Sequence, residues 1–272
     1  MLAAERRRAI AELVAARPGT RSDELAERFA VSAETIRRDL LYLQRAGAVR
    51  RVHGGATPPG PPRAVEDSFV KRTGRNAGGK QAMARLAATL VRAGDTVVLD
   101  VGTSALEVAR ALPAEWHGRV LTGSLLAAAE LTGRSGVEVY ASGGRVRGGD
   151  LACSGDTARS FFADHYADIA FLGSGGVHAE AGLTDYHTDE VDVRRIIIDH
   201  SARNYVLADA TKLGVVAVRR VCPLSALDGL ITDGEPDAAL TEALAEHDTE
   251  TLRPGAPGPA ERTARDVPQE DE

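Results

Sequence analysis

The chain has 272 residues, of which 43% are hydrophobic and 26% charged, and its net charge is −6. This length favours two domains, and the lack of any run of about 18 apolar residues argues against a membrane-spanning protein. The charge is uneven, because residues 1–53 hold eleven arginines against seven acids and the remainder is strongly acidic. A basic N-terminal region on an acidic chain indicates a nucleic-acid partner for that region.

The first residues carry a basic cluster without an apolar segment or a cleavage site, so we expect no signal peptide and a cytoplasmic protein. Cys153 and Cys222 have neither the spacing of a disulfide framework nor that of a metal site, and we expect two buried thiols. No metal or other cofactor is expected, since three histidines of the C-terminal half lack ligand spacing: His178, His187 and His200.

Three short helices are predicted at the N-terminus. The first covers residues 2–16, the second starts near Ser22 as its N-cap and runs to Phe29, and Ser32 caps the third, over residues 33–45. A short helix, a tight turn and a basic second helix form the geometry that lays a recognition helix in the major groove of DNA. Apolar residues form one face of that helix, Ile36, Leu40 and Leu43, and the opposite face is polar.

A strand and a linker follow the third helix. Gly47 ends the helix, and residues 48–52 are predicted to form a strand that supplies a wing together with His53–Gly54–Gly55. The stretch ATPPGPP, residues 56–62, cannot continue a helix. We therefore predict a winged helix-turn-helix domain over residues 1–56 and a linker over residues 57–79.

Residues 80–250 alternate between helical stretches and short β-rich runs, which predicts an α/β domain around a mainly parallel sheet. The final stretch, residues 251–272, is rich in Pro, Gly and acids and has no apolar period, so we expect a disordered acidic tail. The β-rich runs are residues 96–100, 119–122, 137–141, 169–172, 205–209 and 230–232.

Loops rich in glycine and hydroxyl groups follow most of these runs. In an open α/β sheet, ligands bind beyond the carboxyl ends of the strands. Glycine lets the backbone approach a phosphate, and hydroxyls and helix N-terminal N–H groups bind its oxygens. Five such loops at one edge therefore indicate a polar or anionic ligand; they are residues 100–104, 122–124, 142–145, 173–178 and 209–214.

The N-terminal motifs make the interpretation specific. The stretch VSAETIRRDLLYLQRAGAVRRVHGGA (31–56), with ELAERF (24–29) and ERRRAI (5–10), resembles the DeoR family of bacterial regulators. This resemblance implies a winged helix-turn-helix that binds operator DNA. By position, Thr35, Arg37 and Arg38 are expected to reach base edges and adjacent phosphates, and the wing to hold the backbone. The expected wing contacts are Arg50, Arg51 and His53, and Ser22 and Ser32 either donate to phosphates or only cap helices. The alternative is an αα-hairpin whose arginines face water.

Residues 66–233 resemble the effector domain of the same family, which is similar in fold to ribose-5-phosphate isomerase. The resemblance implies a sugar-phosphate effector in a pocket formed by the loops described above. Lys80 and Lys212 are two of only three lysines in the chain, and each either binds the phosphate or forms a salt bridge. The expected effector-binding residues are Lys80, Asp100, Gly102, Thr103, Ser104, Thr122, Gly123, Ser124, Gly143, Gly144, Gly173, Gly175, Gly176, Asp189, Glu190, Arg194 and Lys212.

Several of these positions depart from the family pattern. Gly123 stands where the family usually has Asn, and Gly79 stands where it usually has an acid. Arg194 replaces a lysine, and Asp189 replaces one of two consecutive glutamates. The pocket is expected to persist with a different chemical preference, so a common effector of the family is not assumed.

The predicted function is that of a DNA-binding transcriptional regulator. The preferred hypothesis is a repressor of sugar-metabolism genes, which a sugar phosphate releases from its operator. We expect a homo-oligomer, dimer or tetramer, on double-stranded DNA. An activator of the same architecture and a sugar-phosphate isomerase remain as alternatives. The residue types that an isomerase needs are present in Asp100, Asp185, Asp189, Glu190 and Lys212, but the fused DNA-binding region favours a ligand-gated switch over an enzyme.

Overall fold

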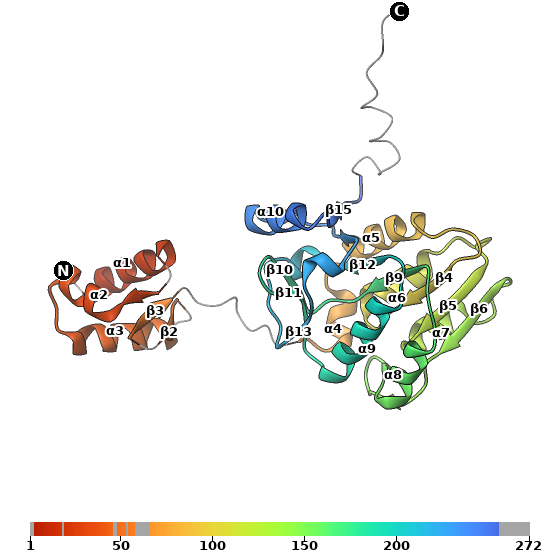
Figure 1. Ribbon diagram of the computed structural model, residues 1–272, viewed down its shortest axis with the longest axis horizontal. Helices are drawn as coiled ribbons and strands as arrows, with labels where there is room; N and C mark the ends of the chain where they lie inside the picture. Colours follow the sequence, from red (N-terminus) through yellow and green to blue (C-terminus); the bar gives the residue numbers. More distant parts are fainter. Residues whose placement is uncertain (1–2, 18, 46–47, 53, 58–65, 256–272) are drawn as a thin grey trace, which may run out of the picture. The chain divides into compact units, whose positions relative to one another are not determined.

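A computed structural model describes residues 3–17, 19–45, 48–52, 54–57 and 66–255. The chain divides into two compact units between Arg63 and Ala64, and each is described by itself (Figure 1). None of the helices in these described ranges is long and apolar enough to cross a membrane.

The N-terminal unit contains the three predicted helices, α1 (Ala3–Ala16), α2 (Ser22–Phe29) and α3 (Ala33–Arg45), beside a small antiparallel sheet. The strands have the order β1 (Thr20–Arg21), β3 (Gly55–Thr57) and β2 (Arg50–Val52). The sequence did not predict β1 or β3. The predicted wing strand, β2, pairs with β3 so that Arg51 lies opposite Ala56. The wing is therefore a two-stranded hairpin. The apolar faces meet in a core of Ile10, Leu25, Ile36 and Leu40, each at most 1% exposed.

A buried carboxylate fixes α1 against α3. Asp39 is 2% exposed, and its two oxygens accept hydrogen bonds from the Nε atoms of Arg6 and Arg7, both at 2.7 Å. The Arg7 guanidinium also lies 4.0 Å from the ring centroid of Tyr42. The basic cluster of the first helix is therefore partly committed to holding this domain together.

The two predicted helix caps differ. The Oγ of Ser32 accepts a hydrogen bond from the N–H of Thr35 at 3.2 Å, which confirms the predicted cap of α3. The cap predicted at Ser22 is wrong, because Arg21 occupies the N-cap position and no side chain caps α2. The N–H of Ser22 donates instead to the carbonyl of Gly54 at 2.8 Å, so the turn of the wing hairpin satisfies this donor.

The C-terminal unit is built on a seven-stranded sheet whose neighbouring strands are all parallel. Its order is β15-β14-β12-β9-β4-β5-β6. All six predicted β-rich runs form strands of this sheet, which confirms the predicted fold class. The strands are β4 (Thr96–Leu99), β5 (Gly118–Thr122), β6 (Val137–Ala141), β9 (Ile169–Leu172), β12 (Asn204–Leu207), β14 (Gly229–Ile231) and β15 (Glu250–Leu252).

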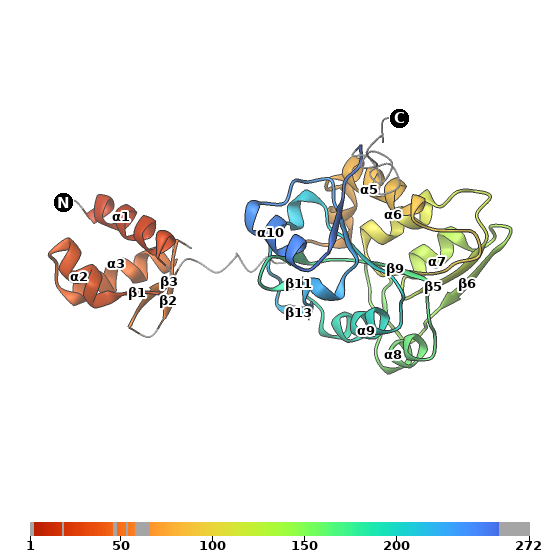
Figure 2. The same ribbon diagram turned by 45° about the horizontal axis from the view of Figure 1, so that its top comes forward.

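Helices cover both faces of this sheet (Figures 1 and 2). Alternate residues along each strand enter opposite apolar clusters; Val97 and Leu99 join one cluster, and Val98 joins the other. The first cluster includes side chains of α5 (Ala77–Thr89), α6 (Thr103–Ala111) and α7 (Leu125–Leu131). The second includes side chains of α8 (Asp156–Ala163), α9 (Thr188–Asp199) and α10 (Ala238–Glu246). Such burial on both faces is typical of parallel sheets.

Two small antiparallel elements stand beside the main sheet. One has the strand order β10 (Gly176–His178), β11 (Gly182–Asp185) and β13 (Arg219–Cys222), and the other is the pair β7 (Arg145–Val146) and β8 (Cys153–Ser154). Cys153 and Cys222 are both buried, as expected.

The structure corrects two predicted boundaries. The stretch 57–79, expected to be a linker, contains α4 (Phe69–Gly74) and the start of α5, because Phe69 packs against the core and its helix joins the C-terminal unit. The predicted tail from residue 251 begins too early, since Leu252 is 3% exposed and lies within β15. Residues 256–272, the rest of that prediction, lie outside the described residues.

Candidate functional site

The main cavity of the C-terminal unit lies where the direction of the strand order reverses. From β4 the chain proceeds to β5 and β6 on one side, and then returns to β9 on the other side of β4. Such a switch point opens a crevice beyond the carboxyl ends of the two strands. The loop Gly102–Ser104 after β4 and the loop Gly173–Gly175 after β9 both line a cavity of about 930 Å³, including its open mouth.

The N-terminus of α6 presents free donors to this cavity. Its N-cap is Gly102, which has φ +109° and offers no side chain to the first N–H groups of the helix. Thr103 is 8% exposed, and among the described residues its hydroxyl has no hydrogen-bond partner. Backbone N–H groups, the helix dipole and a hydroxyl together make this the natural position for an anion.

Lys212 supplies an uncommitted positive charge. It ends the 3-10 turn Ala210–Lys212 that follows β12. Within the described part of the chain its ammonium forms no ion pair, and its Nζ atom lies 5.7 Å from the centroid of the Tyr186 ring. Burial lowers the pKa of Lys212, and Asp209 opposes that shift. A bound anion would therefore supply the partner that this ammonium lacks.

Arg194 is the most deeply buried cation of the site. It is 2% exposed and binds three carboxylates: Asp100, Asp185 at 2.6 Å from Nη1, and Glu190 at 3.2 Å from Nη2. Although burial opposes its charge, Asp100 and Asp185 hold the pKa of Arg194 above its ordinary value. Burial raises the pKa of Glu190, whereas at Asp185 burial is outweighed by Arg194 together with backbone hydrogen bonds from Tyr186 and His187, so the pKa there is lowered. Arg194 thus fixes the ends of β4, β11 and α9 around one point.

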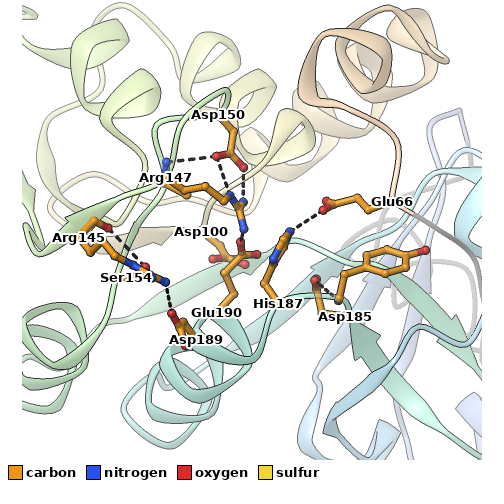
Figure 3. A network of polar contacts seen from close by, with 12 residues as sticks. Glu66, Asp100, Arg145, Arg147, Asp150, Ser154, Asp185, His187, Asp189 and Glu190 are labelled. Carbon is orange, nitrogen blue, oxygen red and sulfur yellow. Dashed lines mark hydrogen bonds and ion pairs between the residues drawn. The ribbon is translucent and has the colours of Figure 1, made fainter.

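A second arginine extends this network toward solvent. Figure 3 shows Arg147 between Asp150 and Glu190, and it forms ion pairs with both. Arg72 of α4 reaches the same Asp150, with 3.6 Å between Nη2 and Oδ2. Sequence reasoning missed Arg72, Arg147 and Asp150. The sequence held one signal for them, the i,i+3 spacing of Arg147 and Asp150. Oppositely charged residues at this spacing are common on protein surfaces.

Lys80 is occupied by backbone groups. Its ammonium is 5% exposed and donates to the carbonyls of Arg72 and of Arg75, the latter at 2.6 Å, while Asp209 lies 4.0 Å away. Burial lowers its pKa. Lys80 lines the cavity, but its donors are used to hold α4 in place rather than left for a ligand.

Nine of the predicted effector-binding residues line the cavity. They are Lys80, Gly102, Thr103, Ser104, Gly173, Gly175, Glu190, Arg194 and Lys212. Asp100 stands behind it, where it accepts a hydrogen bond from the N–H of Gly173 at 2.8 Å and binds Arg194.

The other predicted residues are not brought to the cavity lining. Thr122 is fully buried and its hydroxyl donates to the carbonyl of Leu99 at 2.6 Å, while Ser124 caps α7. Asp189 forms an ion pair with Arg145 at an exposed position. The remaining ones are glycines: Gly123 beside Val101 and Cys153, Gly143 and Gly144 beside Thr157, and Gly176 against Val215.

Gly79, the departure next to Lys80, has a structural explanation. A Cβ atom there would overlap the carboxylate of Asp233, which accepts a hydrogen bond from Nδ2 of Asn76 at 2.6 Å. A second carboxylate at position 79 would meet Asp233 directly, so this chain excludes the acid that is usual there.

The exposed face of α3 is the candidate DNA-binding surface. Glu34 binds Nε of Arg37 at 2.7 Å and Nε of Arg38 at 3.1 Å, and the two arginines are 60% and 76% exposed. Hydrogen bonds from Arg37 and Arg38 lower the pKa of Glu34 to about 2. The hydroxyl of Thr35 is bonded to that of Ser32 at 2.9 Å.

The wing adds the exposed Arg51. The predicted contacts of His53 and of the Arg50 side chain lie outside the described residues.

Comparisons with known proteins agree with this architecture. The family described as "DeoR-like helix-turn-helix domain" matches residues 6–59, and the one described as "DeoR C terminal sensor domain" matches residues 75–234. The HTH-type transcriptional regulator GlpR of Haloferax volcanii is 35% identical over 244 residues, which cover 90% of this chain and 95% of that protein. The glycerol-3-phosphate regulon repressor of Escherichia coli is 30% identical, covering 89% and 96%.

A ribose 5-phosphate isomerase from Methanocaldococcus jannaschii is a structural match. It covers 51% of this chain and 55% of that one, at 19% identity and a TM-score of 0.38. A likeness of this size carries no argument about chemistry, so the fold class rests on the strand order described above.

Proposed function

The chain belongs to the DeoR family of helix-turn-helix transcriptional regulators, and on that premise we propose that it represses sugar-metabolism genes until a sugar phosphate releases it from its operator. The observation that carries the proposal is the cavity at the switch point. It combines the open N-terminus of α6 with the ammonium of Lys212, which forms no ion pair among the described residues. This combination suits a phosphate.

The other groups of the cavity suit a polyhydroxylated carbon chain. Ser104 offers a hydroxyl to the cavity, and Thr211 and Asp209, whose side chains are hydrogen-bonded to each other at 2.6 Å, also line it. Hydroxyl groups of a sugar both donate and accept, so they can bond to such a mixed lining. Relatives support a phosphorylated ligand by name, since one is the glycerol-3-phosphate regulon repressor of Escherichia coli.

The mechanism we propose is a population shift. A homo-oligomer places two copies of α3 in major grooves about 34 Å apart, one DNA turn. The sugar phosphate binds more tightly to a state in which these helices no longer match the operator. A tenfold loss of operator affinity needs only about 1.4 kcal/mol of differential binding.

The test is a fluorescence-anisotropy titration of a duplex taken from DNA upstream of the protein's own gene. Glycerol 3-phosphate, ribose 5-phosphate and fructose 6-phosphate are each compared with glycerol, ribose or fructose at equal ionic strength. We expect salt-sensitive binding that one phosphorylated compound weakens and its unphosphorylated partner does not. Specific binding that no phosphorylated sugar changes would reject the effector class and leave the DNA-binding function intact.

Two alternatives have their own measurements. An activator of the same architecture would raise transcription from the target promoter in vitro, whereas the proposed repressor lowers it. An isomerase needs a free carboxylate base, but the candidate carboxylates are all engaged: Asp100, Asp185 and Glu190 by Arg194, Asp189 by Arg145, and Asp209 by the hydroxyl of Thr211. We therefore expect no conversion of ribose 5-phosphate to ribulose 5-phosphate by the purified protein.

A further inference from the structure

The segment that enters the C-terminal unit lines the cavity itself. The unit begins at Ala64, and residues Glu66, Asp67, Arg72 and Arg75 of its first dozen positions are among the cavity-lining residues. A ligand in the cavity therefore lies against the stretch of chain that comes directly from the DNA-binding domain.

Ion pairs of Glu66 and Arg72 hold this segment at the edge of the cavity, together with the pair of Arg72 with Asp150 and the packing of Phe69 against the core. Glu66 Oε1 binds Nη1 of Arg72 at 3.1 Å, and its Oε2 binds Nε2 of His187, at the start of α9, at 2.7 Å. Figure 3 shows Glu66 and His187 facing each other. From the other side, the ammonium of Lys80 binds the carbonyls of Arg72 and Arg75. Glu66 and Arg72 are each about one-fifth exposed, so this ion pair borders the cavity rather than the dry core.

Arg72 reaches the anion position at the start of α6. A Cβ atom at Gly102 would lie 3.9 Å from Nη1 of Arg72, the same nitrogen that binds Glu66. A phosphate held by the first N–H groups of α6 and by the unpartnered hydroxyl of the nine-tenths buried Thr103 would sit beside this guanidinium. Arginine binds phosphate oxygens in the paired geometry that it uses for a carboxylate, so phosphate and Glu66 compete for it.

We infer that Arg72 is an anion-binding residue of this cavity, and that its transfer from Glu66 to the ligand's phosphate is the step that alters the segment leading to the DNA-binding domain. This inference rests on the proposed function, because it takes the ligand to be phosphorylated. The phosphate gains a charge-assisted bond, and Glu66 keeps only His187. The state with Glu66 bound to Arg72 is then the DNA-binding state.

The test replaces Glu66 without adding a ligand. Glu66→Gln keeps the shape of the side chain but removes one of the two carboxylates that pair with Arg72 and leaves Asp150, so it should imitate the ligand-bound state. We expect operator affinity of the full-length variant to fall about tenfold, and amide hydrogen exchange of the peptide covering residues 66–76 to become faster. The matched control is Glu138→Gln, which breaks the exposed pair between Glu138 on β6 and Arg119 on β5 and should change neither quantity.

A second variant tests the anion contact directly. Inorganic phosphate, compared with chloride at equal ionic strength, should raise the melting temperature of the wild-type protein but not that of Arg72→Gln. Wild-type operator affinity and unchanged exchange in Glu66→Gln would overturn the inference, as would equal stabilisation of wild type and Arg72→Gln by phosphate. If the wild-type protein binds no operator, the proposed function fails, and the exchange and melting measurements still decide the role of Arg72.

Discussion

The arginines of the two units differ in how firmly they are held. On α3, Arg37 and Arg38 are more than half exposed and share one carboxylate, Glu34. In the C-terminal unit, Arg194 is 2% exposed and is surrounded by three carboxylates. Exposed ion pairs contribute little free energy and exchange partners readily, whereas a buried charge depends on every partner it has. The first arrangement suits a surface that must accept DNA phosphates, and the second suits a fixed frame around a ligand.

The largest effect is expected at Arg194. Arg194→Ala leaves three carboxylates in a buried position with their shared partner removed, so the free energy of unfolding of the C-terminal unit should fall by about 3–5 kcal/mol. Urea denaturation followed by the fluorescence of Trp116, which lies in this unit, measures the change. Arg119→Ala removes an exposed pair and is the control, expected to cost under about 1 kcal/mol. If the free energy of unfolding fell by a similarly small amount in both variants, the difference between buried and exposed arginines would be contradicted.

A smaller loss is expected at Asp39, the one buried carboxylate among the described residues of the DNA-binding domain. Asp39→Asn keeps the volume but weakens the bonds to Arg6 and Arg7, so the free energy of unfolding of this domain should fall by about 1.5–3 kcal/mol. Thermal unfolding of residues 1–57 monitored by helix content, within the full-length protein, reports the change. A loss near zero would show that α1 and α3 are held by the apolar core alone.

Arg38→Ala should affect binding and spare stability. We expect operator affinity to fall about tenfold, which corresponds to about 1.4 kcal/mol, and the salt dependence to decrease by about one phosphate contact. The unfolding transition should stay in place because the side chain is 76% exposed. If the variant shifted the unfolding transition and kept its operator affinity, Arg38 would be a residue that stabilises the domain and not a DNA contact.

The smallest effect is expected at Glu34, which competes with DNA for Arg37 and Arg38. Glu34→Gln should strengthen DNA binding about threefold, by removing one negative charge from the surface. The pKa of Glu34 is lowered to about 2, so it stays ionised well below the value of about 4.3 of a free glutamate. Its contribution to the pairs is lost only as the pH falls toward 2. The gain in Glu34→Gln should therefore be equal at pH 5 and pH 7.5, and a gain present only at pH 7.5 would contradict this pKa.

The sequence predicted the regular parts of both units because their signals are local. Apolar spacing located α2 and α3, and short β-rich runs located six strands of the main sheet. The three-residue strand β15 was missed, since Glu250–Leu252 carries a single strongly apolar residue that is buried only through its partner β14.

The site was predicted less completely than the fold. The loops after β4 and β9 could be assigned because parallel strands end at one edge. Arg72 and Arg147 could not, since their ion pairs with Asp150 and Glu190 join residues that are far apart in the sequence. Lys80 lines the cavity, but its binding to two carbonyls depends on where α4 ends and could not be predicted.

The central claim is that a sugar phosphate in the switch-point cavity controls DNA binding, and Lys212 tests it most directly. The measurement is release of the operator duplex by the active sugar phosphate, compared between wild type and Lys212→Met at equal ionic strength. The account predicts that the variant binds the operator as wild type does but needs at least tenfold more sugar phosphate for release. Equal release of both proteins would contradict the assignment of this cavity as the sensor.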